Sequence, residues 1–154
     1  MPGGSELTTI KVAKIIGQTD KLINLPTAKS HSATGVSLGL KSLMGLIWDR
    51  GFLHQRNLNT AIAELATVIK PDLTIADATR ALISGGPGGP GKTVRLDTVV
   101  AGTDPVAVDS YTVGLTPWYN KSFTGSSVKY IVAASELGLG EINPARMAVS
   151  EVTV

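Results

Sequence analysis

Short apolar strands alternate with amphipathic helical segments along this chain, and that alternation restricts its fold more than any other feature. Strand patterns occupy residues 21–25, 73–77 and 96–102, and helical patterns lie between and after them. Such alternation is typical of parallel strands joined by right-handed crossovers. The sequence therefore predicts an α/β fold with a mainly parallel sheet and helices on both faces.

Apolar spacing and capping residues predict the helices and the links between them. Residues 33–48 carry a stripe at three- and four-residue steps, and Asn57 can cap a helix that ends before Pro71. Asp104 followed by Pro105 is a strong helix start. A further helix is expected over 126–137, a connecting loop over 49–56, and an edge strand over 146–154.

Length and composition narrow the class of protein. The 154 residues suit one α/β domain over residues 6–154, and the opening Met-Pro-Gly-Gly-Ser, residues 1–5, is typical of a linker. Hydrophobic residues make up 43% and charged residues 17%, which argues against disorder. The net charge of only +2, without a Lys/Arg run, argues against a nucleic-acid partner.

Cysteine usage and hydropathy set further limits. The chain has no cysteine, so it can hold neither a disulfide nor a Cys-ligated iron–sulfur cluster of its own. No apolar run reaches the roughly 20 residues that span a bilayer, so we expect no membrane span. A cytoplasmic location is the default expectation, and export would require that a native signal has been removed.

The glycine-rich segment 86–93 reads G-P-G-G-P-G-K-T and matches the phosphate-loop pattern G-x-x-x-x-G-K-[ST]. A phosphate loop needs backbone amides around the anion and a helix that begins at the Lys-Thr. Here Pro87 and Pro90 remove two amides, and the residues after Thr93 are strand-like. The pattern therefore favours a rigid turn between two strands over a nucleotide site.

Polar residues follow the predicted strands, where ligands bind in open α/β sheets. Lys29, Ser30 and His31 come after the first strand, just before the helix expected from residue 33. Lys29 and His31 could form an anion pocket with that helix N-terminus. His54, in the predicted loop, could join them. Each also has an ordinary interpretation, as a solvated charge or a hydrogen-bonded histidine.

Three aspartates form the second part of the predicted site. Asp77 ends the second strand, Asp104 follows the third, and Asp109 lies within an apolar helix. Together they could bind a divalent cation, and Asp109 or His31 could act as a catalytic acid or base. The ordinary interpretation makes Asp104 a helix cap and Asp77 a loop acceptor, with Asp109 facing solvent.

Several separated motifs resemble the family called domain of unknown function 362. The resemblance runs from about Asp20 to Ile142. It rests on the segments 20–50, 52–55, 61–78, 86–91, 101–110 and 134–142. The family's glycine-rich loop has no Lys-Thr requirement, which agrees with the rejection of a nucleotide site.

The family's motifs fall on particular residues of this chain. They cover Lys29 to His31, then Thr34, and later Lys41, with Ser42 in place of the usual Asn. The ligand-binding candidates are thus Lys29, Ser30, His31, Thr34, Lys41, Asp77 and Asp104. The metal candidates are Asp77, Asp104 and Asp109. Members usually extend upstream, so the resemblance implies an N-terminally shortened chain.

Three functions are open at this stage. The first is an uncharacterised domain that binds a small polar or anionic ligand at its strand ends; the resemblance implies a redox setting and a ferredoxin-type partner for it. The second is a metal-dependent enzyme that acts on a small anionic substrate. The third is a non-catalytic docking module with an exposed apolar patch that includes Trp118 and Tyr119.

Overall fold

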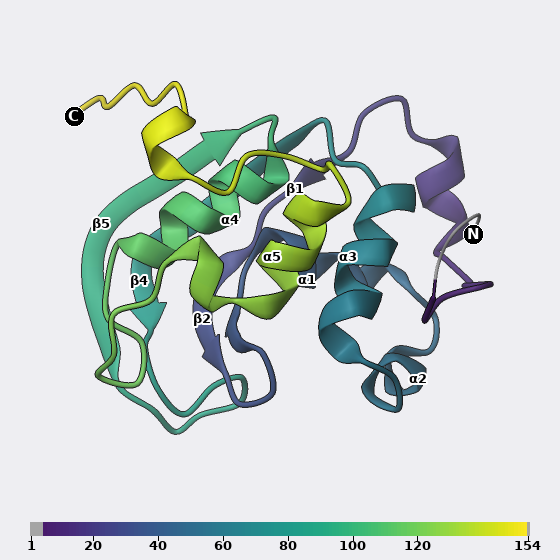
Figure 1. Cartoon of the computed structure of the whole chain (residues 1–154), viewed down its shortest axis with the longest axis horizontal. Coiled ribbons are helices and arrows are strands. Elements are labelled where there is room, and N and C mark those ends of the chain that lie inside the picture. The colour runs from purple at the N-terminus through teal and green to yellow at the C-terminus, as the bar shows by residue number, and fades with distance from the viewer. Residues whose placement is uncertain (1–4, 154) are drawn as a thin grey trace.

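A computed structural model describes residues 5–153 of the chain, and it is an α/β domain built on one five-stranded sheet (Figure 1). The prediction of a single α/β domain with a mostly parallel sheet is confirmed. The strands are β1 (Ile23–Asn24), β2 (Thr27–His31), β3 (Gly35–Ser37), β4 (Leu73–Leu82) and β5 (Thr93–Gly102).

Strand β4 is the centre of the sheet. Strand β5 runs antiparallel along it from Thr74 to Leu82, so β1 and β2 share its other edge, and both run parallel to it. Strand β3 then pairs antiparallel with β2 and extends the sheet by one strand. Parallel pairing therefore holds where crossovers join the strands, and antiparallel pairing where a turn or a loop joins neighbours.

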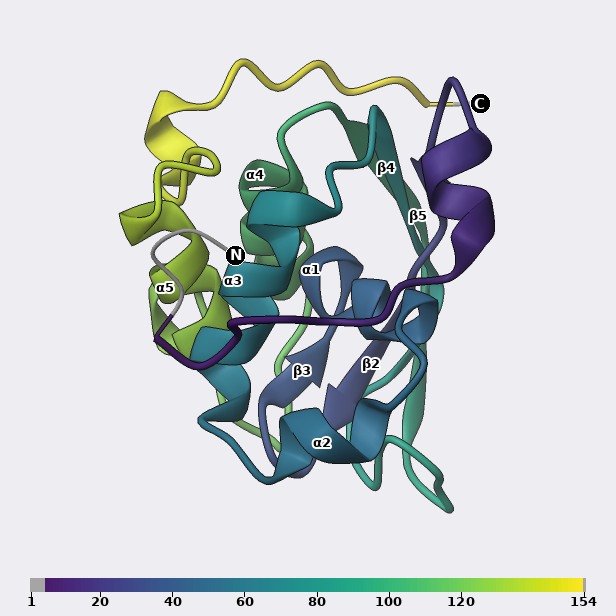
Figure 2. The same cartoon turned by 90° about the vertical axis from the view of Figure 1, so that its right-hand side faces the viewer.

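The helices gather on one side of β4 and β5, as Figure 2 shows for α3, α4 and α5. On β4 the side chains of Thr74, Ala76 and Ala78 are buried, whereas Asp77 and Thr79 on the opposite face are exposed. The α-helices are α1 (Gly39–Ser42), α2 (Arg50–His54), α3 (Leu58–Val68), α4 (Pro105–Gly114) and α5 (Lys129–Glu136). The 3₁₀ segments are η1 (Lys14–Gln18), η2 (Leu43–Leu46), η3 (Gly125–Ser127) and η4 (Pro144–Arg146).

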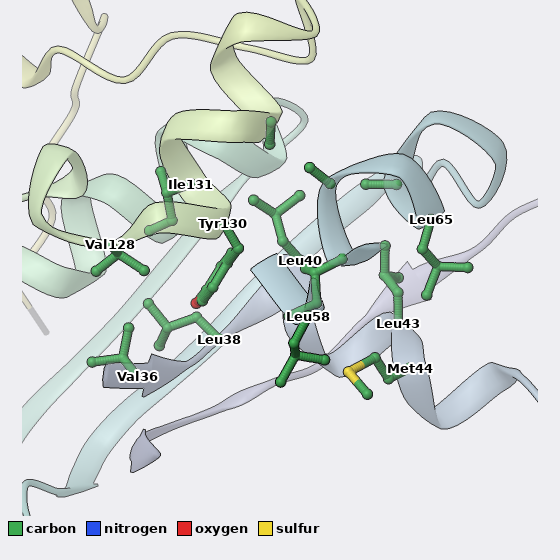
Figure 3. Packing of buried hydrophobic residues seen from close by; sticks show 14 of the residues in the cluster. Val36, Leu38, Leu40, Leu43, Met44, Leu58, Leu65, Val128, Tyr130 and Ile131 are labelled. Carbon is green, nitrogen blue, oxygen red and sulfur yellow. The ribbon is translucent and has the colours of Figure 1, made fainter. Parts of the chain in front are cut away.

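The apolar core lies between these helices and the sheet. Figure 3 shows Leu40 of α1 packed near Tyr130 of α5 and near Leu58 of α3, and all three are buried. Burial of such side chains supplies most of the favourable free energy of folding. The short helix α1 therefore depends on tertiary packing, because four residues cannot form a stable helix in water.

The capped helices appear as predicted. Asn57 accepts a hydrogen bond from Thr60 N–H and caps α3, and Asp104 accepts one from Ala107 N–H and caps α4. The helix predicted over 126–137 is present as η3 followed by α5. Strong local signals therefore located these three elements.

The single helix predicted over 33–48 is wrong. Its apolar stripe is buried, but the segment divides into β3, α1 and η2. Gly35 has a φ of +79°, and a Cβ on Gly39 would lie too close to the Asp109 carboxylate. Pairing with β2 and close packing on α4 thus override the helical periodicity.

Other predicted boundaries also change. Residues 49–56 contain the helix α2, because the Asp49 carboxylate accepts a hydrogen bond from Phe52 N–H and caps it. Residues 26–32 contain β2, and β4 continues past Asp77 to Leu82. The tail forms no strand over residues 147–153; Tyr111 donates to Glu151 there instead.

Two further predictions concern the ends and the surface. Residues 1–4 of the predicted linker lie outside the described residues, while Ser5 donates two hydrogen bonds to Glu64. Trp118 is fully buried and its indole N–H donates to Val113 O, so it cannot form part of an exposed apolar patch. Within residues 5–153, no helix has the length and apolar character needed to cross a membrane.

Candidate anion-binding site

A pocket of about 470 Å³ opens beside β2, and three elements supply its polar side chains. These elements are β2, the segment from β3 to η2, and the helix α2. Its lining residues are Leu25, Pro26, Thr27, Lys29, His31, Ser37, Leu38, Lys41, Ser42, Met44, Gly45, Arg50, His54 and Pro87.

Strand β2 presents alternate residues to this pocket. Thr27, Lys29 and His31 line it, whereas Ala28 and Ser30 between them are buried and do not. Successive side chains on a strand point to opposite faces, so one face of β2 faces the pocket. The predicted polar residues after residue 26 therefore belong to a strand, and no helix begins at residue 33.

The Lys41 side chain is the most unusual group in the pocket. It is only 8% exposed, and among residues 5–153 its ammonium has one hydrogen-bond acceptor, the Met44 sulfur, 3.7 Å away. Burial lowers the pKa of Lys41, and the positive charges of Lys29 and Arg50 lower it further. Buried ammonium groups are usually paired with an anion.

Helix α2 brings two more basic residues to the pocket. Arg50 and His54 are four residues apart and therefore lie on the same side of this one-turn helix. Arg56 beyond them lies over the Phe52 ring, 4.7 Å from its centroid, and does not line the pocket. The helix thus adds a cationic wall that faces β2.

His31 is neutral at physiological pH. Burial lowers its pKa to about 4, and the charges of Lys41, His54 and Lys29 add to this effect. Ala33 N–H donates to its Nδ1 over 3.2 Å, so the neutral ring carries its proton on Nε2. His31 can therefore donate a hydrogen bond to a ligand from Nε2.

The pocket lacks a compensating negative charge. Among its described lining residues none is an aspartate or a glutamate. A second, more open hollow of about 610 Å³ contains Arg80, Arg95 and Asp97, and there Arg95 already pairs with Asp97 at 2.7 Å. The first pocket has no such acidic partner, so its cationic side chains repel one another. A bound anion would remove this repulsion, and the first pocket is therefore suited to an anion.

The glycine-rich loop forms one wall of the pocket through Pro87. Gly86 N–H donates to Ser30 Oγ over 3.0 Å, and a Cβ on Gly86 would collide with the Ser30 carbonyl oxygen. Strand β5 begins at Thr93, three residues before the predicted strand; a strand and not a helix therefore follows the loop, as the sequence predicted. The phosphate-loop architecture is not formed.

The three predicted metal-binding aspartates are engaged separately. Asp77 accepts from the amide and hydroxyl of Thr79, which lower its pKa. Asp104 accepts from Ala107 N–H and from Glu141 N–H. Over residues 5–153, no three His, Cys, Asp or Glu side chains are placed so that they could hold a metal ion.

Asp109 is fully buried and does not line the pocket. Its carboxylate accepts from Gly39 N–H over 2.7 Å and from Leu40 N–H over 3.0 Å. Burial raises its pKa to about 7, although both hydrogen bonds act in the opposite direction. The expectation that this residue faces solvent is therefore wrong.

The structure thus brings together part of the predicted ligand set. Lys29, His31 and Lys41 line one pocket, and His54 joins them. Ser30 instead holds the glycine-rich loop, and the buried Thr34 donates to Val36 O. Sequence reasoning missed Arg50, although an Asp49 cap could have located the helix that carries it.

Comparison with known proteins gives one match. The family model described as domain of unknown function (DUF362) matches residues 1–114, which include all the lining residues of the pocket. No curated protein and no solved structure matches the chain. The match covers most of the 154 residues and agrees with the resemblance seen in the motifs. The chain therefore belongs to the DUF362 family.

Proposed function

We propose that this domain binds a small organic anion in the pocket beside β2. The observation that carries the proposal is the Lys41 ammonium: it is 8% exposed, and the part of the chain that the structure describes offers it only the Met44 sulfur as a hydrogen-bond acceptor. A carboxylate or phosphate group next to it would supply the missing counter-charge. It would also relieve the repulsion among Lys29, Lys41 and Arg50.

The remaining lining residues define the ligand more closely. His31 offers a neutral N–H donor, which suits a ligand oxygen of either charge state. Leu25, Leu38, Met44 and Pro87 supply apolar surface. A ligand with a carbon skeleton and an anionic group would contact both the apolar and the basic lining residues of the pocket.

The alternatives from the sequence remain predictions. A metal-dependent reaction gains no support from the three aspartates, because each of them accepts hydrogen bonds from different partners and the three do not form one group. The redox setting and the ferredoxin-type partner rest on the family resemblance. Anion binding is the function that the pocket itself supports.

The test is a titration followed by NMR of the two histidine rings, with inorganic phosphate and acetate as probes. We expect saturable shifts of the His31 signals and an increase of its pKa on binding, because the anion offsets the nearby positive charges. In Lys41→Met the affinity should fall at least about tenfold, the loss expected for one buried charge-assisted contact.

Lys129→Met is the matched control, because Lys129 is an exposed lysine at the start of α5. It removes the same charge from the chain but should leave the affinity unchanged. Equal anion affinity in Lys41→Met and in the wild type would contradict the proposal.

A further inference from the structure

We propose that Asp109 is a positioning residue for the anion pocket: from inside the core it fixes the start of α1 and thereby the place of Lys41. The inference rests on the proposed anion-binding function. It goes beyond that function because Asp109 has no contact with the pocket.

The first step is the geometry of the carboxylate. Asp109 lies in the middle of α4, and its two oxygens accept from two successive amides, Gly39 N–H at 2.7 Å and Leu40 N–H at 3.0 Å. Two hydrogen bonds to neighbouring amides fix the direction of the backbone as well as its distance. Lys41 is the next residue along the chain.

The same turn is held from a second side. Asn24 Nδ2 donates to Gly39 O over 2.9 Å, and the Ser42 hydroxyl lies 2.6 Å from Asn24 Oδ1. A Cβ on residue 39 would lie 2.7 Å from Asp109 Oδ1 and 2.9 Å from Thr74 Cγ2. The backbone at Gly39 is therefore clamped between α4, β4 and β1.

This clamp decides where Lys41 points. Leu40 packs into the core near Tyr130 and Leu58, as Figure 3 shows. Consecutive helical residues are rotated by about 100°, so Lys41 leaves the core and enters the pocket. Because α1 has only four residues, its own hydrogen bonds cannot hold this orientation without the carboxylate.

A purely structural role for Asp109 makes a different prediction, and His31 can report the difference. After burial, the charge of Lys41 is the largest cause of the low pKa of His31. If Lys41 moves away, the pKa of His31 must rise. A loss of stability elsewhere in the folded protein would leave that pKa unchanged.

The experiment uses the 154-residue chain and compares Asp109→Asn with Ser110→Ala. Asparagine keeps the shape of the side chain but turns an N–H₂ donor toward one of the two amides. Ser110 is the adjacent buried residue of α4, and its hydroxyl donates to Ile142 O, far from α1 in the sequence. The readouts are the pKa of His31 by NMR and the affinity for inorganic phosphate.

We expect Asp109→Asn to raise the pKa of His31 by about one unit, the effect of moving one nearby like charge. Its phosphate affinity should fall about tenfold or more, because the anion loses a charge-assisted hydrogen bond. Ser110→Ala should lower the melting temperature but leave both readouts at wild-type values. If folded Asp109→Asn matches Ser110→Ala in both readouts, the inference is overturned.

Asn24→Ala covers the case in which Asp109→Asn does not fold. Asn24 is only half-buried, and its loss frees the other side of the Gly39 turn. A raised His31 pKa in this variant supports the clamp, and an unchanged one overturns it. If wild-type protein binds no phosphate, the proposed function fails, but the pKa comparison still decides whether Asp109 positions Lys41.

Discussion

Buried acids and the buried cation of this protein have opposite surroundings. Glu64, 5% exposed, accepts hydrogen bonds from the amides of Ser5, Glu6 and Leu7, and Asp109, 0% exposed, accepts two from α1. Lys41 is buried almost as deeply, but its only hydrogen-bond acceptor within the described chain is the Met44 sulfur. The described chain supplies hydrogen-bond donors to both buried carboxylates, whereas it supplies no oxygen or nitrogen acceptor to the buried ammonium.

This contrast separates structural charges from a charge available to a ligand. A buried charge costs several kcal/mol unless it is hydrogen-bonded, so a folded chain usually provides its partners. The two carboxylates have theirs, and each ties two distant segments together. Among residues 5–153, the Lys41 ammonium has only the weak thioether acceptor of Met44, and it lies in a pocket lined by further cations.

Removing a buried carboxylate that accepts several hydrogen bonds should give the largest loss of stability. Glu64→Ala leaves the amides of Ser5, Glu6 and Leu7 without their acceptor. We expect the free energy of unfolding to fall by about 4 kcal/mol, which urea denaturation measures. Glu136→Ala, an exposed glutamate on α5, should change it by less than about 0.5 kcal/mol. Similar losses in the two variants would erase the distinction between buried and solvated acids.

Substitutions in the glycine-rich loop test how closely this loop packs on β2. Gly86→Ala puts a methyl group against the Ser30 carbonyl, so we expect a loss of about 2–3 kcal/mol, as for overpacking elsewhere. Gly88→Ala in the same loop meets no atom within 4 Å and should be close to neutral. Thermal or urea unfolding of the pair provides the measurement. A neutral Gly86→Ala would show that the loop is not closely packed on β2.

Removing the charge of Lys41 should stabilise the protein, in contrast to removing a buried carboxylate. In anion-free buffer Lys41→Met should raise the free energy of unfolding by about 1–2 kcal/mol, because an apolar side chain replaces a buried ammonium that has only a thioether acceptor among residues 5–153. Excess phosphate should reverse the order, since only the wild type gains stability from the ligand. Destabilisation by Lys41→Met in anion-free buffer would mean that the ammonium already has a protein partner.

The dependence of stability on pH provides a further comparison, because burial lowers the pKa of His31 and raises that of Asp109. His31 has a folded pKa of about 4 against an ordinary 6.5, so the unfolded chain takes up its proton first, and stability falls as pH drops from 6.5 to 4. Asp109 has a folded pKa of about 7 against 3.8, so the folded chain takes up its proton first. Its contribution therefore rises as pH drops from 7 to 4, and the two contributions oppose each other.

Single variants should expose each contribution. Relative to the wild type, His31→Asn should gain stability on acidification between pH 6.5 and 4, and Asp109→Asn should lose it. Urea denaturation at four or five pH values gives the slopes. Parallel slopes for the two variants would contradict the opposite surroundings assigned to these groups.

The basic half of the site could be found from the sequence because its residues are close together in the chain. Lys29 and His31 are two apart, and two apart on a strand means the same face. The prediction placed these residues at the N-terminus of a helix from residue 33, which the structure does not contain; they share a pocket because they lie on one face of β2. Lys41 came only from the family motif, because no local pattern shows that it turns into a pocket.

The positions of the three predicted aspartates could not be inferred from their spacing in the sequence. Asp104 and Asp109 belong to the same helix, yet Asp104 caps that helix while Asp109 reaches residues 39–40. Their spacing of five residues does not show which neighbouring segment each one meets. Asp77 seemed to end a strand, but pairing with β5 carries β4 on to Leu82.

The sequence by itself determined the α/β class, the caps of α3 and α4, the strand after the glycine-rich loop, and the absence of cysteine ligands. These properties depend on periodicity, capping residues and composition, which act over a few residues. Only the tertiary structure decided that 33–48 divides into β3, α1 and η2, that the Asp109 carboxylate accepts from Gly39 N–H, and that Lys41 finds only the Met44 sulfur among the described residues. These outcomes depend on the pairing of β3 with β2 and on contacts such as that of Asp109 with Gly39, about 70 positions apart in the chain, and the free energy of such tertiary contacts exceeds local preference.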